Sequence, residues 1–207
     1  MLTHDIEQGS DEWLALRAGK PTASAFSKLV TSTGAESKSM PEYAITLACE
    51  VYAGKPVDSF EGNKWTERGH SLEDSARAKY EMTHDIDTQQ VGFITDDYER
   101  YGCSPDSLVG DNGLLEIKCL KSENHAKAIM YYQKHGKVPT TYVAQVQGQM
   151  FVAGREWCDL AFFHPDLPML VIRSEPDDKI ITTLESQLTA VQMERDAVVE
   201  NLRQAAA

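Results

Sequence analysis

Apolar residues recur at helical spacing in seven segments, most of them bounded by a helix start or stop signal. Ser10, followed by two acidic residues, predicts a helix start, whereas Gly19 and Gly54 predict helix ends. The predicted helices cover about 10–19, 22–30, 40–53, 65–82, 122–134, 140–152 and 177–204. Most of the chain is therefore expected to be helical.

Between these helices the pattern changes to the alternation that is typical of strands. A meander of three strands is predicted around 91–93, 101–103 and 114–119, and two further strands are predicted near 157–163 and 169–173. This order predicts an α/β fold, a central mixed five-stranded sheet flanked by helices. We expect a single domain over 1–207, with N-terminal helices at about 10–82 and a long C-terminal helix at about 177–204.

Charge limits the ways in which this chain could bind nucleic acid. The formal net charge is −12, which argues against a uniformly basic surface that coats phosphates. The distribution is uneven, because residues 118–137 contain five lysines and one acidic residue, whereas 157–207 contain nine acidic residues and four basic ones. Any surface for nucleic acid is expected to be local, with the lysines facing it and the acidic C-terminal helix facing away.

Several classes of protein are disfavoured by what the sequence lacks. No apolar run approaches the roughly 18 residues that span a bilayer, so we expect a soluble, intracellular protein with no membrane partner. The four cysteines are far apart and form no C-x-x-C pair, which favours buried thiols over an iron–sulfur cluster. Glycine-rich nucleotide-binding motifs are also missing, so no nucleotide cofactor is expected.

The most informative segment contains Asp106, Glu116 and Lys118. In a strand, Glu116 and Lys118 point to the same face, about 6.6 Å apart. A two-residue turn at Asn112-Gly113 would direct Asp106 to the opposite face. A three-residue loop, Asp111–Gly113, would pair residues 108 with 116 and 106 with 118, and would bring all three polar groups together. We predict this second register.

Two carboxylates at this spacing are suited to a hard divalent cation, and an adjacent lysine could position or deprotonate an attacking water. This equipment suits phosphodiester hydrolysis. The alternative is structural: Asp106 caps a turn, and Glu116 and Lys118 form an ordinary ion pair on a sheet face. The three residues alone leave both interpretations open.

The spacing of S-P-D at 104–106 and E-x-K at 116–118 resembles the signature of the PD-(D/E)xK nuclease superfamily. The wider chain, from residue 7 to about 175, is similar to one branch, the phage lambda exonuclease-like or YqaJ-like viral recombinase family. Its N-terminal motif resembles Glu7-Gln8-Gly9, Leu16–Gly19 and Thr22–Ser24. The resemblance implies that Arg17 and Ser24, with Ser104 as a weaker candidate, bind a 5′-phosphate.

Two further stretches carry the resemblance. Arg68-Gly69-His70 with Leu72–Arg77 resembles the helix whose glutamate faces the metal, which implies a catalytic role for Glu73. Tyr142–Gln147 resembles the glutamine motif behind the E-x-K strand, and it implies that Gln145 lies near the attacking water. The implied metal ligands are Asp106, Glu116, Glu73 and the backbone carbonyl of Ile117.

The resemblance implies a Mg²⁺-dependent 5′-to-3′ exonuclease on double-stranded DNA ends, in which Mn²⁺ substitutes for Mg²⁺. It also implies release of mononucleotides, a homotrimeric ring, and a 3′ single strand left for a phage-type single-strand annealing protein. The expected location is the cytoplasm of a bacterial host cell. Two alternatives stay open at this point: a RecB-like or CRISPR-associated nuclease of the same superfamily, and a non-catalytic protein that binds DNA ends.

The chain departs from the family pattern at two places. Ser107 stands where a glycine usually follows S-P-D. An arginine usually found a few residues after E-x-K has no clear counterpart, which leaves Lys121, Asn124 and His125 as candidates to complete the phosphate pocket.

Overall fold

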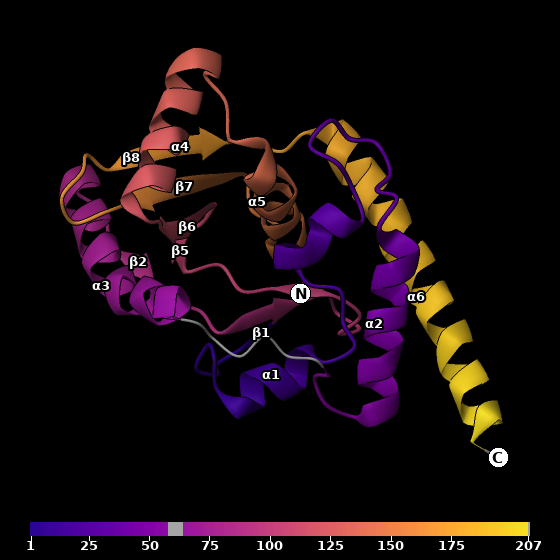
Figure 1. Ribbon diagram of the computed structural model, residues 1–207. Coiled ribbons are helices and arrows are strands. Elements are labelled where there is room, and N and C mark those ends of the chain that lie inside the picture. Colours follow the sequence, from indigo (N-terminus) through magenta and orange to yellow (C-terminus); the bar gives the residue numbers. More distant parts are fainter. Residues whose placement is uncertain (58–63, 207) are drawn as a thin grey trace.

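Two β-sheets with helices packed around them make up the computed structural model (Figure 1). It describes residues 1–57 and 64–206, and of residues 64–71 the backbone alone. The side chains of the predicted motif Arg68-Gly69-His70 thus lie outside the described residues. The helical elements are α1 (Asp11–Arg17), η1 (Ala23–Lys28), α2 (Met40–Ala53), α3 (Lys64–His84), α4 (Ser122–His135), α5 (Thr140–Ala153) and α6 (Asp178–Ala205).

The larger sheet has five strands in the order β2-β5-β6-β7-β8. These strands are β2 (Thr88–Gln89), β5 (Ser107–Val109), β6 (Gly113–Cys119), β7 (Trp157–Phe163) and β8 (Leu170–Ser174). β6 and β7 are parallel and are connected through α4 and α5, whereas the other neighbouring pairs are antiparallel. The predicted mixed five-stranded sheet with flanking helices is confirmed.

The predicted three-strand meander is wrong in its pairing. β3 (Phe93–Thr95) and β4 (Gly102–Cys103) form a separate three-stranded sheet with β1 (Leu2–His4), a strand that the sequence pattern did not reveal. Ser104, Pro105 and Asp106 separate β4 from β5, and proline cannot donate to a strand ladder. The chain therefore leaves one sheet at this proline and enters the other at Ser107.

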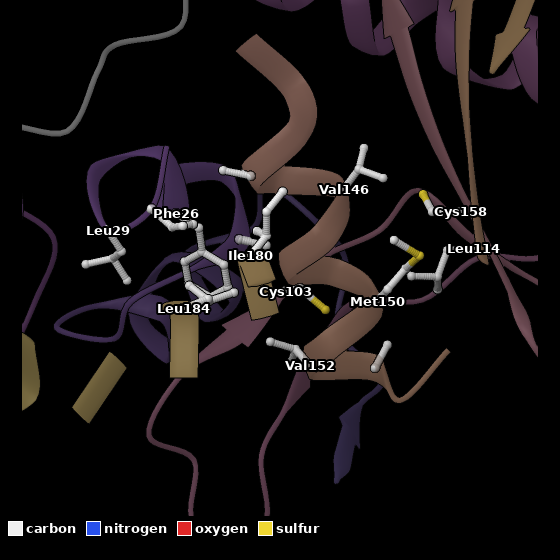
Figure 2. Close-up of a cluster of buried hydrophobic side chains, with 14 of the residues drawn as sticks. Phe26, Leu29, Cys103, Leu114, Val146, Met150, Val152, Cys158, Ile180 and Leu184 are labelled. Carbon is white, nitrogen blue, oxygen red and sulfur yellow. The ribbon is translucent and has the colours of Figure 1, made fainter. Parts of the chain in front are cut away.

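Helices cover both faces of the five-stranded sheet. On one face, Ala76 and Tyr80 of α3 pack against Leu115 and Ile117 of β6. On the other face, α5 packs against the sheet and also contacts η1 and α6. Figure 2 shows this core, in which side chains from η1, α5, β6 and α6 meet, among them Phe26, Met150, Leu114 and Leu184. Because both faces are buried, a polar side chain on β6 needs a specific partner.

The helix ends follow the sequence signals. Ser10 caps α1, since its Oγ accepts a hydrogen bond from Trp13 N, and Gly54 ends α2 in the left-handed conformation. The predicted helix over 22–30 is a 3₁₀ helix, Ala23–Lys28. α6 begins after Asp177, which caps it, and it runs along α2 to the C-terminus (Figure 1). Within the described part of the chain, no helix is both long and apolar enough to cross a bilayer.

Candidate active site

The β5–β6 hairpin brings the S-P-D and E-x-K segments together. Its pairing joins Val109 to Gly113, so the connecting loop is Gly110–Asn112, with Gly110 in the left-handed region at φ 53°. The loop was predicted one residue later, at Asp111–Gly113. The predicted strand pairing is therefore wrong by two residues, because Leu108 pairs with Leu114 and not with Glu116. A shift of two preserves the side-chain face. Asp106 consequently lies beside β6, where its Oδ2 accepts a hydrogen bond from Ile117 N at 2.5 Å.

Glu116 is the centre of the hydrogen-bond network on this face. The side chain is buried, with 3% of the residue exposed, and both carboxylate oxygens accept hydrogen bonds. Oε1 accepts from Lys118 Nζ at 2.6 Å and from Gln145 Nε2 at 2.5 Å, while Oε2 accepts from Gln149 Nε2 at 2.6 Å. Residues from one strand and one helix thus meet at a single carboxylate, which an exposed surface ion pair would not require.

Charges in this cluster shift one another. Burial, together with the negative charges of Glu116 and Glu73, raises the pKa of Asp106 well above its usual value. Burial lowers the pKa of Lys118, but the carboxylates of Glu116 and Asp106 outweigh that effect and hold this pKa above its usual value. Lys118 is therefore a charged ammonium at neutral pH, which suits a role in donating hydrogen bonds.

Glu73 lies on the other side of Asp106, on α3. The two carboxylates line a cavity of about 410 Å³ together with Arg77, Gln8 and Gln90. Arg77 Nε donates to Ser107 Oγ at 3.0 Å, and Ser107 Oγ in turn donates to the backbone carbonyl of Asp106 at 2.6 Å. The serine that replaces the family's usual glycine thus connects α3 to the Asp106 segment.

The donor set fits a divalent cation. The negative charges of Glu116 and Glu73 both raise the pKa of Asp106, which means that they disfavour its ionised form, and a bound cation would favour that form. In the described part of the chain, no three Asp, Glu, His or Cys side chains are already arranged as a metal site. Glu116 accepts hydrogen bonds from Lys118 and two glutamines, and Asp106 accepts one from Ile117 N.

A second polar cluster surrounds Arg17 at the end of α1. Its guanidinium donates to the hydroxyls of Ser104 at 3.4 Å, Thr22 at 3.3 Å and Ser24 at 3.4 Å. Trp13 stacks on it, with Arg17 Cζ 3.9 Å from the ring centroid, and Trp13 Nε1 donates to Ser104 Oγ at 2.9 Å. The structure therefore brings together Arg17, Ser24 and Ser104, three residues separated by up to 87 positions in the sequence.

This cluster contains a cation without an ionic partner. Burial lowers the pKa of Arg17 to about 10. Among the residues the structure describes, no carboxylate forms an ion pair with its guanidinium. Arg17 lines a cavity of about 410 Å³ together with Lys20, Lys28 and one carboxylate, Glu50, whose negative charge raises the pKa of Arg17 without outweighing the effect of burial. A cation that is desolvated and unpaired is a favourable place for an anionic ligand.

Two residues at these sites were not predicted from the sequence to be site residues. Gln149 was missed although it lies four positions after Gln145, a spacing that places both on one face of α5. Ser107 was noted only as a departure, because its contact with Arg77 joins two residues 30 positions apart in the sequence. Gln147, between the two glutamines, points away and accepts a hydrogen bond from Asp177 N at the start of α6.

The three candidates to complete the phosphate pocket differ in burial and position. His125 is fully buried, and its Nε2 contacts the backbone carbonyl of Pro168, so it does not face an open pocket. Asn124 lines a different cavity, of about 240 Å³, beside Tyr142. Lys121 precedes α4 and stays a candidate. Of the four cysteines, Cys103 and Cys158 are buried and Cys49 and Cys119 half-buried, and none of these four is in a disulfide.

Comparisons with known proteins identify the family and the fold. The model of the YqaJ-like viral recombinase domain matches residues 12–156. An alkaline exonuclease from Laribacter hongkongensis is 35% identical, with a TM-score of 0.82 over 95% of this chain and 98% of that one. Its complex with dAMP gives a TM-score of 0.81 at 35% identity, over 95% and 98% of the two chains.

A phage-related exonuclease from Haemophilus somnus 129PT shares the fold, at 17% identity and a TM-score of 0.70 over 88% of this chain and 96% of that one. No match is found among curated protein sequences. The family model spans both the Arg17 cluster and the Glu116 cluster, and the structural likeness extends over nearly the whole chain. The chain belongs to the YqaJ-like viral recombinase family.

Proposed function

We propose that this protein is a Mg²⁺-dependent 5′-to-3′ exonuclease that degrades one strand of double-stranded DNA from an end and releases mononucleotides. The observation that carries the proposal is the cluster beside β6, where Glu116 accepts hydrogen bonds from Lys118 and Gln145, and Asp106 accepts one from Ile117 N. The similarity to an alkaline exonuclease over 95% of this chain, at 35% identity, supports the same reaction class.

Asp106, Glu116, Glu73 and the backbone carbonyl of Ile117 would hold the cation, and Mn²⁺ would substitute for Mg²⁺. When bound, the cation would supply Lewis acidity toward the phosphate and a more acidic water. Lys118 and Gln145 then donate hydrogen bonds to the water or to a phosphate oxygen, in place of their contact with Glu116 Oε1. No nucleotide or iron–sulfur cofactor takes part in this scheme.

Arg17, Ser24 and Ser104 would bind the 5′-phosphate at the DNA end. An arginine fork with hydroxyl donors matches phosphate oxygens, and an anion would neutralise the half-buried guanidinium. Arg17 donates a hydrogen bond to Ser104, and Asp106 is only two residues after Ser104 in the sequence. A phosphate held at Arg17 would therefore position the adjacent phosphodiester near the carboxylates.

The proposal includes a homotrimeric ring around the DNA and a phage-type single-strand annealing protein that receives the 3′ strand. The lysines of 118–137 would line the channel and the acidic α6 would face outward. Light scattering of the purified protein should then give three times the mass of 23.1 kDa. Activity should fall steeply with salt, since each neutralised phosphate adds to the salt dependence of binding.

Digestion of a linear duplex, labelled separately at each 5′ and 3′ end, tests the proposed function. With Mg²⁺, we expect early release of the 5′ label as a mononucleotide, late release of the 3′ label, and no digestion after chelation. Early release of the 3′ label would contradict the polarity, and equal digestion in excess chelator would contradict the metal dependence.

A further inference from the structure

Gln149 of α5 is buried beside the proposed metal ligand, with 1% of the residue exposed. Its Nε2 donates to Glu116 Oε2 at 2.6 Å. We propose that Gln149 is a positioning residue for hydrolysis, which holds the Glu116 carboxylate in the orientation needed to bind the cation. This inference rests on the proposed function.

The division of contacts between the two oxygens supports this role. Oε1 accepts from Lys118 and Gln145, the two residues that the proposed mechanism turns toward the water and the phosphate. Oε2 accepts from Gln149, which has no part in that mechanism. When Oε1 loses its two donors, Gln149 still fixes the rotation of the carboxylate through Oε2. Hydrogen-bonded partners of metal ligands commonly act in this way.

The amide of Gln149 carries an energetic cost that its contact with Glu116 offsets. Its Oε1 is buried and has no hydrogen-bond partner among the residues the structure describes. An unpaired buried carbonyl is unfavourable, and a methionine or leucine of similar size would avoid it. The N–H donated to a buried carboxylate is a charge-assisted hydrogen bond, the strong kind. Rotating the amide to pair Oε1 would direct an oxygen at the carboxylate instead.

The backbone around Gln149 is held from two sides. Cys103 Sγ on β4 donates to the backbone carbonyl of Gln149, with 3.9 Å between the two atoms. A Cβ at the preceding Gly148 would lie 2.1 Å from Phe26 Cδ2, so η1 packs directly on α5 at this point. Because its backbone is fixed, Gln149 can restrain Glu116 rather than move with it.

Substitution of Gln149 by methionine removes the N–H donor and keeps the length of the side chain. The matched control is Gln147→Met, on the same helix, where the buried side chain donates to Ser174 Oγ and Glu175 O on the far side. Calorimetric titration of the DNA-free proteins with Mg²⁺ and Mn²⁺ gives the affinity. Digestion of a 5′-phosphorylated duplex gives kcat and KM, and thermal unfolding gives Tm.

For Gln149→Met we expect divalent-cation affinity to fall about 10- to 100-fold, with a lower kcat and an unchanged KM for DNA ends. Gln147→Met should lower Tm and leave the cation affinity as in the wild type. If Gln149→Met does not fold, Gln149→Asn replaces it, since its shorter amide does not reach Oε2. Wild-type cation affinity in the folded variant would overturn the proposal.

A double-mutant cycle with Glu116→Gln separates positioning from a general effect on stability. If Gln149 acts through Glu116, adding Gln149→Met to Glu116→Gln should weaken cation binding no further. An equal additional loss in that background would contradict the inference. The two failures are distinguishable: a wild-type protein that neither binds Mg²⁺ nor digests DNA contradicts the proposed function, whereas an unaffected Gln149→Met contradicts only this inference.

Discussion

The Glu116 cluster and the Arg17 cluster differ in how their charges are balanced. Glu116 is buried with a lysine 2.6 Å away and two glutamine donors, so the protein supplies its counter-charge. Arg17 has hydroxyl acceptors and a tryptophan ring, but no carboxylate partner in the described part of the chain. The first cluster therefore has its counter-charge in direct contact, while the second has a guanidinium with no ion pair and with Glu50 as the carboxylate of its cavity.

The largest expected effect is on the first cluster. Lys118→Ala should reduce kcat on linear duplex by about 10³-fold, because it removes the positioned ammonium next to Glu116. Binding of 5′-phosphorylated ends should persist, since the Arg17 cluster is intact. Single-turnover digestion and end binding by fluorescence anisotropy measure the two properties. Lys79→Ala, an exposed lysine on α3, is the control for loss of one charge.

Loss of both properties in Lys118→Ala would mean that the two clusters do not act separately. Wild-type digestion by a folded Lys118→Ala protein would argue against an enzyme built on this lysine.

A smaller effect is expected from the hydroxyls of the second cluster. Ser24→Ala and Ser104→Ala each remove one hydrogen-bond donor to the end phosphate. Each variant should lower kcat/KM on phosphorylated ends by about 10-fold. The effect of Ser104→Ala should be the larger, because Ser104 also contacts Trp13. Ser186→Ala, on the exposed face of α6, should match the wild type. Unchanged kcat/KM in both site variants would remove the hydroxyls from the phosphate pocket.

Gly148→Ala tests how the two clusters are connected. The added Cβ would meet the ring of Phe26, 2.1 Å away, and push η1, which carries Ser24, away from α5, which carries Gln145 and Gln149. We expect a loss of about 1–3 kcal/mol in the free energy of unfolding, measured by urea denaturation. Digestion and end binding should both weaken. A change in only one of them would show that the α5–η1 contact serves that cluster alone.

The smallest effect concerns pH and the stability of the metal-free protein. Because the pKa of Asp106 is raised in the folded state, its ionisation opposes folding, and the stability it provides is present at low pH and lost as pH rises through that pKa. Asp106→Asn should therefore raise Tm at pH 8 by a few degrees (roughly 2–4 °C per kcal/mol), and the gain should shrink as pH falls. Thermal unfolding in chelator measures both. A gain that grows toward low pH would contradict the raised pKa.

Much of the fold is predictable because its signals are local. Ser10, Gly54 and Asp177 mark helix ends through their own caps, and the apolar run of β6 identifies a buried strand. Strand pairing is not local. The split at Pro105 and the addition of β1 to a second sheet depend on contacts about 90 residues apart in the sequence, which periodicity does not encode.

The candidate site shows the same division. Strand parity predicts that Asp106, Glu116 and Lys118 share a face. The register error of two residues does not change this prediction, because a shift of two residues keeps every side chain on the same face of the sheet. The grouping of Arg17, Ser24 and Ser104 came from family resemblance, since no spacing rule connects a helix end to a strand end. Gln149 was detectable by helical spacing alone, but only after Gln145 had been given a role.

The most direct test of the account combines the Arg17→Ala variant with removal of the 5′-phosphate, in four digestions of the same linear duplex in Mg²⁺. Wild-type protein should digest dephosphorylated ends about 10- to 100-fold more slowly than phosphorylated ends. Arg17→Ala should digest both at that slower rate, with no further loss when the phosphate is removed. Full sensitivity to the phosphate in Arg17→Ala, or equal wild-type rates on both ends, would contradict the assignment of this cluster to the DNA end.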